Sequence, residues 1–160
     1  MDTSIALVTG ANKGIGIQIA RQLAGAGLTV YVGSRDAARG ERAAEEIGGD
    51  ARPLVLDVTD AASIADAARQ VDTLDVLINN AGISGDGKTP DREDAGTFRH
   101  IYETNVFGVV AVTNAFLPAL RRSAHPRTTG PPGSSSPGTE RRSRGKKRRS
   151  DVRAYTEAIR

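Results

Sequence analysis

Residues 9–16 read Thr-Gly-Ala-Asn-Lys-Gly-Ile-Gly, and they constrain the fold of this 160-residue chain more than any other stretch. They follow an apolar run at residues 5–8, which is typical of a short buried strand, and they precede a segment in which Ile15, Ile19 and Leu23 recur every four residues. We therefore expect a strand that turns sharply into a helix, with these three side chains on the buried helix face. Glycines permit such a turn, and helix N-termini attract anions, so the pattern is typical of a phosphate-binding loop.

The spacing of the glycines narrows the choice of ligand. From Gly10 to Gly16 the loop reads Gly-x-x-x-Gly-x-Gly, and it lacks the Gly-Lys-Ser/Thr ending of nucleotide triphosphatase loops. A dinucleotide is therefore favoured over ATP, and a tight turn without a ligand is the alternative. The residues expected to cradle the phosphates are Gly10, Asn12, Lys13, Gly14, Ile15 and Gly16.

Alternation of strand and helix patterns continues along the chain. Apolar, β-favouring runs at residues 28–32, 54–56 and 74–78 are each followed by a segment with helical periodicity. Four strands that alternate with helices predict an α/β fold, a doubly wound parallel sheet with helices on its faces. The longest helical pattern spans residues 98–120, and its expected buried stripe consists of Val106, Val109, Val110, Thr113, Phe116, Leu117 and Leu120.

Charged residues follow two of the expected strands. They lie at the carboxyl ends of these strands, which is where parallel sheets bind ligands. Arg35 has a guanidinium that matches a phosphate group, and Lys13 can add a second positive charge, so the pair favours the 2′-phosphate of NADP. Asp36 supplies an acid that would suit the free ribose hydroxyl of NAD, and solvated surface charges are the alternative interpretation. Asp57 lies at the end of an expected strand, where it can either face a bound ligand or cap a turn.

Four segments together resemble the short-chain dehydrogenase/reductase family, and its carbonyl reductases in particular. They are residues 9–16, Asp57-Val58, residues 79–82 (Asn-Asn-Ala-Gly) and residues 105–108 (Asn-Val-Phe-Gly). The resemblance covers about residues 3–120. It implies a Rossmann-like fold, NADP(H) as the cofactor, and reduction of a small carbonyl compound, or oxidation of an alcohol, by hydride transfer.

The resemblance also implies roles for individual residues. Asp57 and Val58 would border the adenine, and Asn80 would lie near the nicotinamide ribose. Asn105 would be catalytic, because the matching asparagine of the family positions a lysine and a water in a proton relay. Asparagine is a poor helix former, so its place within a helical pattern independently favours a functional role over a tolerated polar residue.

The composition changes after residue 120. Residues 1–120 hold 10 basic and 16 acidic residues, whereas residues 121–160 hold 12 basic and 3 acidic ones. Proline, glycine and serine dominate residues 131–138, and residues 141–149 are strongly basic, which is typical of a disordered segment. We therefore predict an NADP-binding domain at 1–120 and a disordered basic tail at 121–160. The sheet would be incomplete, because no strand is expected at 121–150 to pair with the fourth one.

The catalytic groups of the family are not all found in these 160 residues. The relay needs a serine on a fifth strand and a Tyr-x-x-x-Lys motif, but Tyr155 is followed four positions later by Ile159. A truncated or frame-shifted reductase is the favoured interpretation. One alternative is a basic tail that contacts another molecule, and a nucleic acid is not the favoured partner. The other alternative is an NADP-binding module without catalysis.

Composition excludes several other classes of function. The chain has no cysteine and only two histidines, so disulfides, thiolate metal sites and histidine-rich metal sites are not expected. It has no apolar run of about 18 residues and no signal-peptide pattern, which predicts a cytoplasmic protein without a membrane segment. The sequence contains no indication of the oligomeric state or of the particular substrate.

Overall fold

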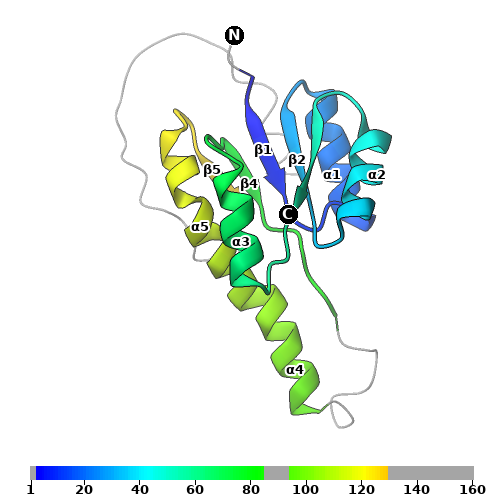
Figure 1. The fold of residues 1–160 in the computed structure, drawn as a ribbon, viewed down its shortest axis with the longest axis vertical. Coiled ribbons are helices and arrows are strands. Elements are labelled where there is room, and N and C mark those ends of the chain that lie inside the picture. The colour runs from blue at the N-terminus through cyan, green and yellow to red at the C-terminus, as the bar shows by residue number, and fades with distance from the viewer. Residues whose placement is uncertain (1–2, 85–93, 130–160) are drawn as a thin grey trace.

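The computed structural model describes residues 3–84 and 94–129, which form one parallel sheet with helices on both faces (Figure 1). The strands are β1 (Ile5–Val8), β2 (Thr29–Ser34), β3 (Ala51–Val55), β4 (Val76–Ile78) and β5 (Arg127–Thr129). The helices are α1 (Gly14–Gly25), α2 (Ala37–Ile47), α3 (Ala61–Arg69), α4 (Ala95–Tyr102) and α5 (Gly108–Arg122), with a π-helical turn, η1 (Glu103–Phe107), between the last two. The strands lie in the order β3-β2-β1-β4-β5, and neighbouring strands are parallel. The predicted α/β doubly wound fold is confirmed.

Two apolar cores lie on opposite faces of the sheet. Side chains alternate along β1, so that Leu7 joins the core beneath α3 and α5 whereas Ala6 and Val8 join the core beneath α1 and α2. Figure 1 shows these two pairs of helices on either side of the strands. Because both faces of β1 are covered, its sequence is a continuous apolar run.

The centre of the sheet brings together the loops that follow β1 and β4. The chain leaves β1 toward β2 on one side, and β4 lies on the other side, so the two crossovers diverge at this point. Backbone hydrogen bonds hold the ends of three strands in register: Thr9 N donates to Ile78 O at 3.0 Å, and Ala11 N donates to Gly33 O at 2.9 Å. In sheets of this kind, such a divergence creates a crevice beyond the carboxyl ends of the strands.

Helix α1 exists as predicted, but its buried face differs from the predicted one. Ile15 is 76% exposed, whereas Ile17, Ala20 and Leu23 are buried against the sheet. Ile15 lies in the first turn, where the helix has only just left the loop, and none of the described elements buries it. The expected stripe was therefore wrong at its first residue and correct at Leu23.

The long helical pattern at 98–120 is three elements. The π-helical turn η1 separates α4 from α5, and α4 extends beyond the carboxyl ends of the strands (Figure 1). A π-turn accommodates one extra residue, so a stripe drawn with the α-helical period loses its register there. Val106, within the π-turn, is exposed, and so is Val110, which lies in α5 away from the residues that this helix buries; both correct the prediction. The residues buried on α5 are Gly108, Val112, Phe116, Ala119 and Leu120.

Strand β5 corrects the prediction that β4 has no neighbour on this side. Residues 127–129 pair in parallel with residues 76–78, and Arg127 N donates to Asp75 O at 2.8 Å. The turn before the strand is held by side chains, since Ser123 Oγ donates to Asp75 Oδ1 at 2.5 Å and accepts from His125 N at 3.0 Å. A three-residue strand without an apolar run gives no periodic signal. Residues 130–160, which make up most of the predicted tail, lie outside the described residues.

Candidate functional site

The loop between β1 and α1 is packed tightly at two of its glycines and is open at the third. A Cβ at Gly16 would lie 2.5 Å from both Asn80 Nδ2 and Gly10 O, and a Cβ at Gly10 would lie 2.9 Å from Ala81 Cα. Gly14 has a φ of +59°, and no neighbouring atom lies within 4 Å of the position that a Cβ would take there. The backbone around Gly14, at the N-terminus of α1, is therefore the part of the loop that another molecule can approach.

Thr9 and Asn80 fasten this loop to the end of β4. Thr9 Oγ1 accepts from the backbone N–H groups of Asn80 at 3.0 Å and Ala81 at 2.9 Å. Asn80 Nδ2 in turn donates to the backbone oxygens of Thr9 at 2.9 Å and Gly10 at 3.2 Å. Asn79 Nδ2 donates to Thr113 Oγ1 on α5 at 3.2 Å. The asparagine pair, which is half-buried, thus ties β4 to β1 and to α5, as expected of amides at the end of a central strand.

The segment after β2 carries the basic residues of the site. Asp36 caps α2, because its Oδ1 accepts from Arg39 N at 2.9 Å, and its Oδ2 lies 3.6 Å from Arg39 Nε. Ser34 Oγ donates to Asp36 O at 2.8 Å and fixes the turn between them. The carboxylate of Asp36 is therefore engaged by its own helix, while Arg35 is exposed beside it.

Asp57 has the turn role that the sequence left open. Its Oδ1 accepts from Thr59 Oγ1 at 2.7 Å and from Thr59 N at 2.9 Å. These two bonds, with a smaller contribution from the positive charge of Arg35, hold the pKa of the Asp57 carboxyl below its ordinary value. The adenine role of Asp57 is compatible with this geometry and stays a prediction.

Asn105 lies in the π-helical turn and joins it to the segment after β4. Its Oδ1 accepts from Ile83 N at 2.9 Å, and its Nδ2 donates to Ile83 O at 2.8 Å. Gly82 lies directly beside it, because a Cβ there would be 3.3 Å from Asn105 Oδ1. The amide therefore satisfies the backbone of a loop residue, which explains how asparagine is accommodated where a regular helix would disfavour it.

One hollow of about 400 Å³ brings the predicted cofactor residues together. All ten line it: Gly10, Asn12, Lys13, Gly14, Ile15, Gly16, Arg35, Asp57, Val58 and Asn80. Asn105 is not among the lining residues, but its partner Ile83 is. Of the other lining residues, the sequence had offered Asp36 as an acid for the ribose and Ala81 and Gly82 as part of a motif. Those that it missed are Ser34, Arg39, Leu56, Thr59, Ile83, His100 and Thr104. Most of these residues are next to predicted ones in the sequence. Arg39 and His100 are not, and they could be found only once the positions of α2 and α4 in space were known.

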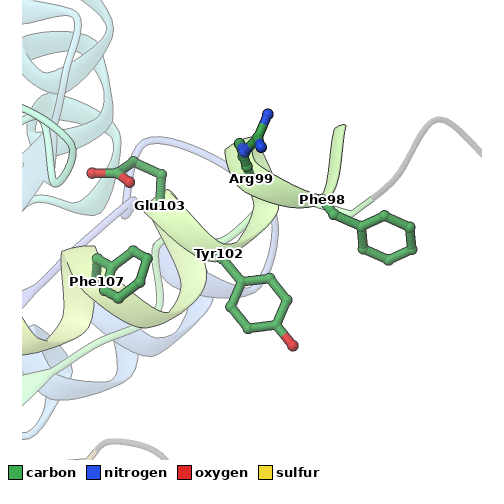
Figure 2. A pocket seen from close by; sticks show the side chains of 5 residues that line it. All are labelled: Phe98, Arg99, Tyr102, Glu103 and Phe107. Carbon is green, nitrogen blue, oxygen red and sulfur yellow. The ribbon is translucent and has the colours of Figure 1, made fainter. Parts of the chain in front are cut away.

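A second hollow, of about 460 Å³, lies on the outside of α4 and η1 and is lined by Phe98, Arg99, Tyr102, Glu103 and Phe107. Figure 2 shows Phe98 and Tyr102 projecting from one side of α4 and Arg99 and Glu103 from another. None of the predicted cofactor residues lines this hollow. In the part of the chain that the structure describes, no group of three or more histidine or acidic side chains is arranged to hold a metal ion. None of the described helices is long and apolar enough to cross a membrane.

Residues 4–127 match the model of the family described as short chain dehydrogenase. The chain belongs to this family. Short-chain dehydrogenase anuI of Penicillium roqueforti (strain FM164) is 39% identical over 132 residues, a match that covers 76% of this chain and 51% of that protein. The chain thus spans about half the length of the curated relatives it matches.

Solved structures of the family have the same fold, and they include complexes with NADH and with NADP. The 3-ketoacyl-(acyl-carrier-protein) reductase from Brucella melitensis, complexed with NADH, has a TM-score of 0.69 and 32% sequence identity over 74% of this chain and 50% of its own. A metagenomic short-chain oxidoreductase in complex with NADP has a TM-score of 0.70 and 30% identity over 78% of this chain and 60% of its own. Membership of an oxidoreductase family that binds NAD(P)(H) is therefore established.

Proposed function

We propose that this chain binds NADPH in the hollow beyond the carboxyl ends of β1, β2 and β3, as the cofactor-binding part of a carbonyl reductase. The observation that carries the proposal is the convergence of ten residues, chosen for cofactor chemistry in separate parts of the sequence, on one hollow. A small carbonyl or alcohol compound would be the substrate, and the cytoplasm the compartment. NADPH, when bound, supplies the hydride.

The N-terminus of α1 is the proposed pyrophosphate site. The first N–H groups of a helix have no partners within the helix, and the helix dipole adds partial positive charge there. Gly14 leaves the approach to them open, and Lys13 lines the same part of the hollow with a full positive charge. Two phosphates that carry negative charge suit these donors.

Preference for the 2′-phosphate is proposed to come from Arg35 together with Lys13, and Arg39 is a further cation that lines the hollow. An acid that selects NAD accepts from the ribose hydroxyls. Here the nearest candidate, Asp36, already accepts from Arg39 N and lies beside the Arg39 guanidinium. This engagement supports NADPH over NADH, because the group that would favour NADH is occupied in capping α2.

Three further residues complete the proposed contacts of the cofactor. Asp57 and Val58 would border the adenine at the end of β3, and Asn80 would approach the nicotinamide ribose from the end of β4. Asn105 keeps its proposed place in the proton relay, and its amide also fixes the loop at Ile83 that lines the hollow.

The second candidate function is binding of NADPH without reduction of a substrate. It is favoured by the sequence, because none of the three tyrosines in these 160 residues is followed four positions later by lysine. In the family mechanism a lysine beside the tyrosine lowers the pKa of the phenol, which matches it to proton transfer near neutral pH. We therefore expect this chain alone to bind the cofactor but to lack family-level turnover.

Calorimetric titration of the purified chain with NADPH and with NADH tests the proposal. Tighter binding of NADPH is the expected result, and absence of binding to both would contradict it. Oxidation of NADPH in the presence of a ketone or an aldehyde then separates the two candidates. Steady turnover that is lost in Tyr155→Phe would show that the tail supplies the acid and would overturn the expectation of an inactive chain.

A further inference from the structure

His100 lines the proposed cofactor hollow from α4, together with Asp57, Val58 and Thr59 of the loop after β3. Thr104 follows one turn later, lines the same hollow and is only 8% exposed. Gly108 follows at the same four-residue spacing and packs against Val58, because a Cβ at Gly108 would lie 2.9 Å from Val58 O and 3.1 Å from Val58 Cγ2. His100 and Thr104 thus line the same hollow as Val58, and Gly108, which follows the π-helical turn, packs on Val58.

The other sides of α4 face elsewhere. Phe98 and Tyr102 project from one side and Arg99 and Glu103 from another, and these four line the separate outer hollow (Figure 2). His100 does not line that outer hollow. His100 is therefore a residue of the cofactor hollow and not of the outer hollow.

The position of His100 is held by contacts that do not involve its own side chain. Asn105 binds both backbone groups of Ile83, which fixes the π-helical turn directly after α4. Asp94 Oδ1 accepts from Thr97 N at 2.8 Å and caps the other end of the helix. The imidazole is thus presented from a short helix that is anchored at both ends.

The chemistry of the hollow defines what the ring can do. The charged residues that line it are Lys13, Arg35, Asp36, Arg39 and Asp57. Among the described residues of the lining, His100 carries the one aromatic ring, and its side chain is exposed to the solvent in the hollow. A flat ring in this hollow matches a flat heterocycle, because stacking of a base on an aromatic ring is favourable whatever the base.

We propose that His100 is a further cofactor-binding residue, which stacks on the adenine of the bound dinucleotide from the side opposite Val58. This proposal rests on the proposed function, since it requires a dinucleotide in the hollow. It assigns part of the affinity for the dinucleotide to α4 as well as to the end of β3.

Calorimetric titration of the full chain with NADPH and with adenosine 2′,5′-bisphosphate tests the proposal. We expect His100→Ala to weaken both ligands by a similar factor of about five or more, which corresponds to a stacking contribution of ~1 kcal/mol. His100→Phe should bind as tightly as the wild type within about twofold, because it keeps a flat ring. Arg99→Ala, on the adjacent side of the helix, is the matched control and should leave both affinities unchanged.

The outcomes separate this proposal from the proposed function. If the wild type binds NADPH and His100→Ala binds it equally well, the role of His100 is overturned while cofactor binding stands. If His100→Phe is as weak as His100→Ala, stacking is overturned. If the wild type binds neither NADPH nor the bisphosphate, the proposed function fails and the role of His100 fails with it. Circular dichroism of each variant confirms that the fold is retained.

Discussion

Asn105 and Ile83 are joined by two reciprocal hydrogen bonds, in which the side-chain amide of one residue satisfies both backbone groups of the other. The bonds connect η1 to the segment that follows β4, two parts of the chain that are 22 residues apart. Ile83 lines the proposed cofactor hollow, so the shape of this wall depends on an amide that lies outside it. The relationship gives Asn105 a structural role in addition to any part in proton transfer.

Asn105→Asp is expected to lower the free energy of unfolding by about 1–3 kcal/mol. Aspartate still accepts from Ile83 N, but the ionised carboxylate cannot donate to Ile83 O and places negative charge beside that carbonyl. Urea denaturation at neutral pH measures the effect. Asn114→Asp, the same substitution at an exposed position of α5, is the matched control and should change stability little. Equal effects at the two positions would contradict the role of the reciprocal bonds.

Thr9→Val is expected to destabilise the fold by about 2 kcal/mol or more, because two backbone N–H groups lose their acceptor. The groups belong to Asn80 and Ala81, and Thr9 itself is buried. Thr9→Ser keeps the oxygen and loses one methyl group, which corresponds to about 1 kcal/mol. If the valine variant unfolds at the same urea concentration as the serine variant, the hydroxyl does not fasten the loop.

The glycines of the loop are expected to respond differently to substitution. Gly16→Ala would place a Cβ against Gly10 O and should reduce stability by about 1–3 kcal/mol, since backbone must shift. Gly14→Val meets no neighbouring atom and is strained mainly by its positive φ, but it should abolish binding of NADPH and NADH by blocking the helix N-terminus. Urea denaturation of both variants measures the loss of stability, and calorimetric titration measures the loss of cofactor binding. A folded Gly14→Val that binds NADPH normally would show that the loop has only a structural role.

The sequence was sufficient for the elements that have long apolar patterns and for the residues at their ends. The first four strands and the positions of Gly10, Arg35, Asp57 and Asn80 could be predicted because parallel strands place their carboxyl ends at one edge. What could not be predicted depended on local contacts between distant residues. Strand β5 is positioned by the bond between Ser123 and Asp75, which no periodicity reveals.

The helical region shows a second limit of the sequence. A π-helical turn changes the register of the residues before it relative to those after it, and nothing in the periodic pattern of residues 98–120 marks where the extra residue is placed. Asn105 was recognised as a misfit in a regular helix, and the misfit coincides with this turn. Which side of α4 lines the hollow, and therefore the position of His100, could be seen only from the arrangement of the helices in space.

Arg35→Ala is expected to weaken the binding of NADPH by roughly tenfold and that of NADH by much less. Only NADPH carries the 2′-phosphate, and a hydrogen bond to a charged group contributes ~1.5–3 kcal/mol. Calorimetric titration with both cofactors measures the ratio of the NADPH affinity to the NADH affinity. Arg42→Ala removes an exposed arginine of α2 that does not line the hollow, and it should leave the ratio unchanged. Equal weakening of the two cofactors by Arg35→Ala would overturn the assignment of the 2′-phosphate to this residue.

The contribution of Asp57 to stability is expected to depend on pH in the acidic range. Its folded-state pKa is depressed, first by the hydroxyl and backbone N–H of Thr59 and then by Arg35, so the ionised carboxylate stabilises the fold. This stabilisation is complete above the unfolded-state pKa of about 3.9 and is lost as the pH falls through the lower folded-state pKa. The difference in unfolding free energy between the wild type and Asp57→Asn should therefore be constant from pH 7 to about pH 5 and should change as the pH falls below about 4.

Titration of the Asp57 carboxyl by NMR distinguishes the causes of this shift. Thr59→Val removes the largest one and should raise the pKa of Asp57 toward its ordinary value, whereas Arg35→Ala should raise it by a smaller amount. Since Arg35 is also the proposed partner of the 2′-phosphate, binding of NADPH should partly cancel the effect of Arg35 on Asp57. An Asp57 pKa that rises more in Arg35→Ala than in Thr59→Val would show that the charge of Arg35, and not the turn, controls this carboxylate.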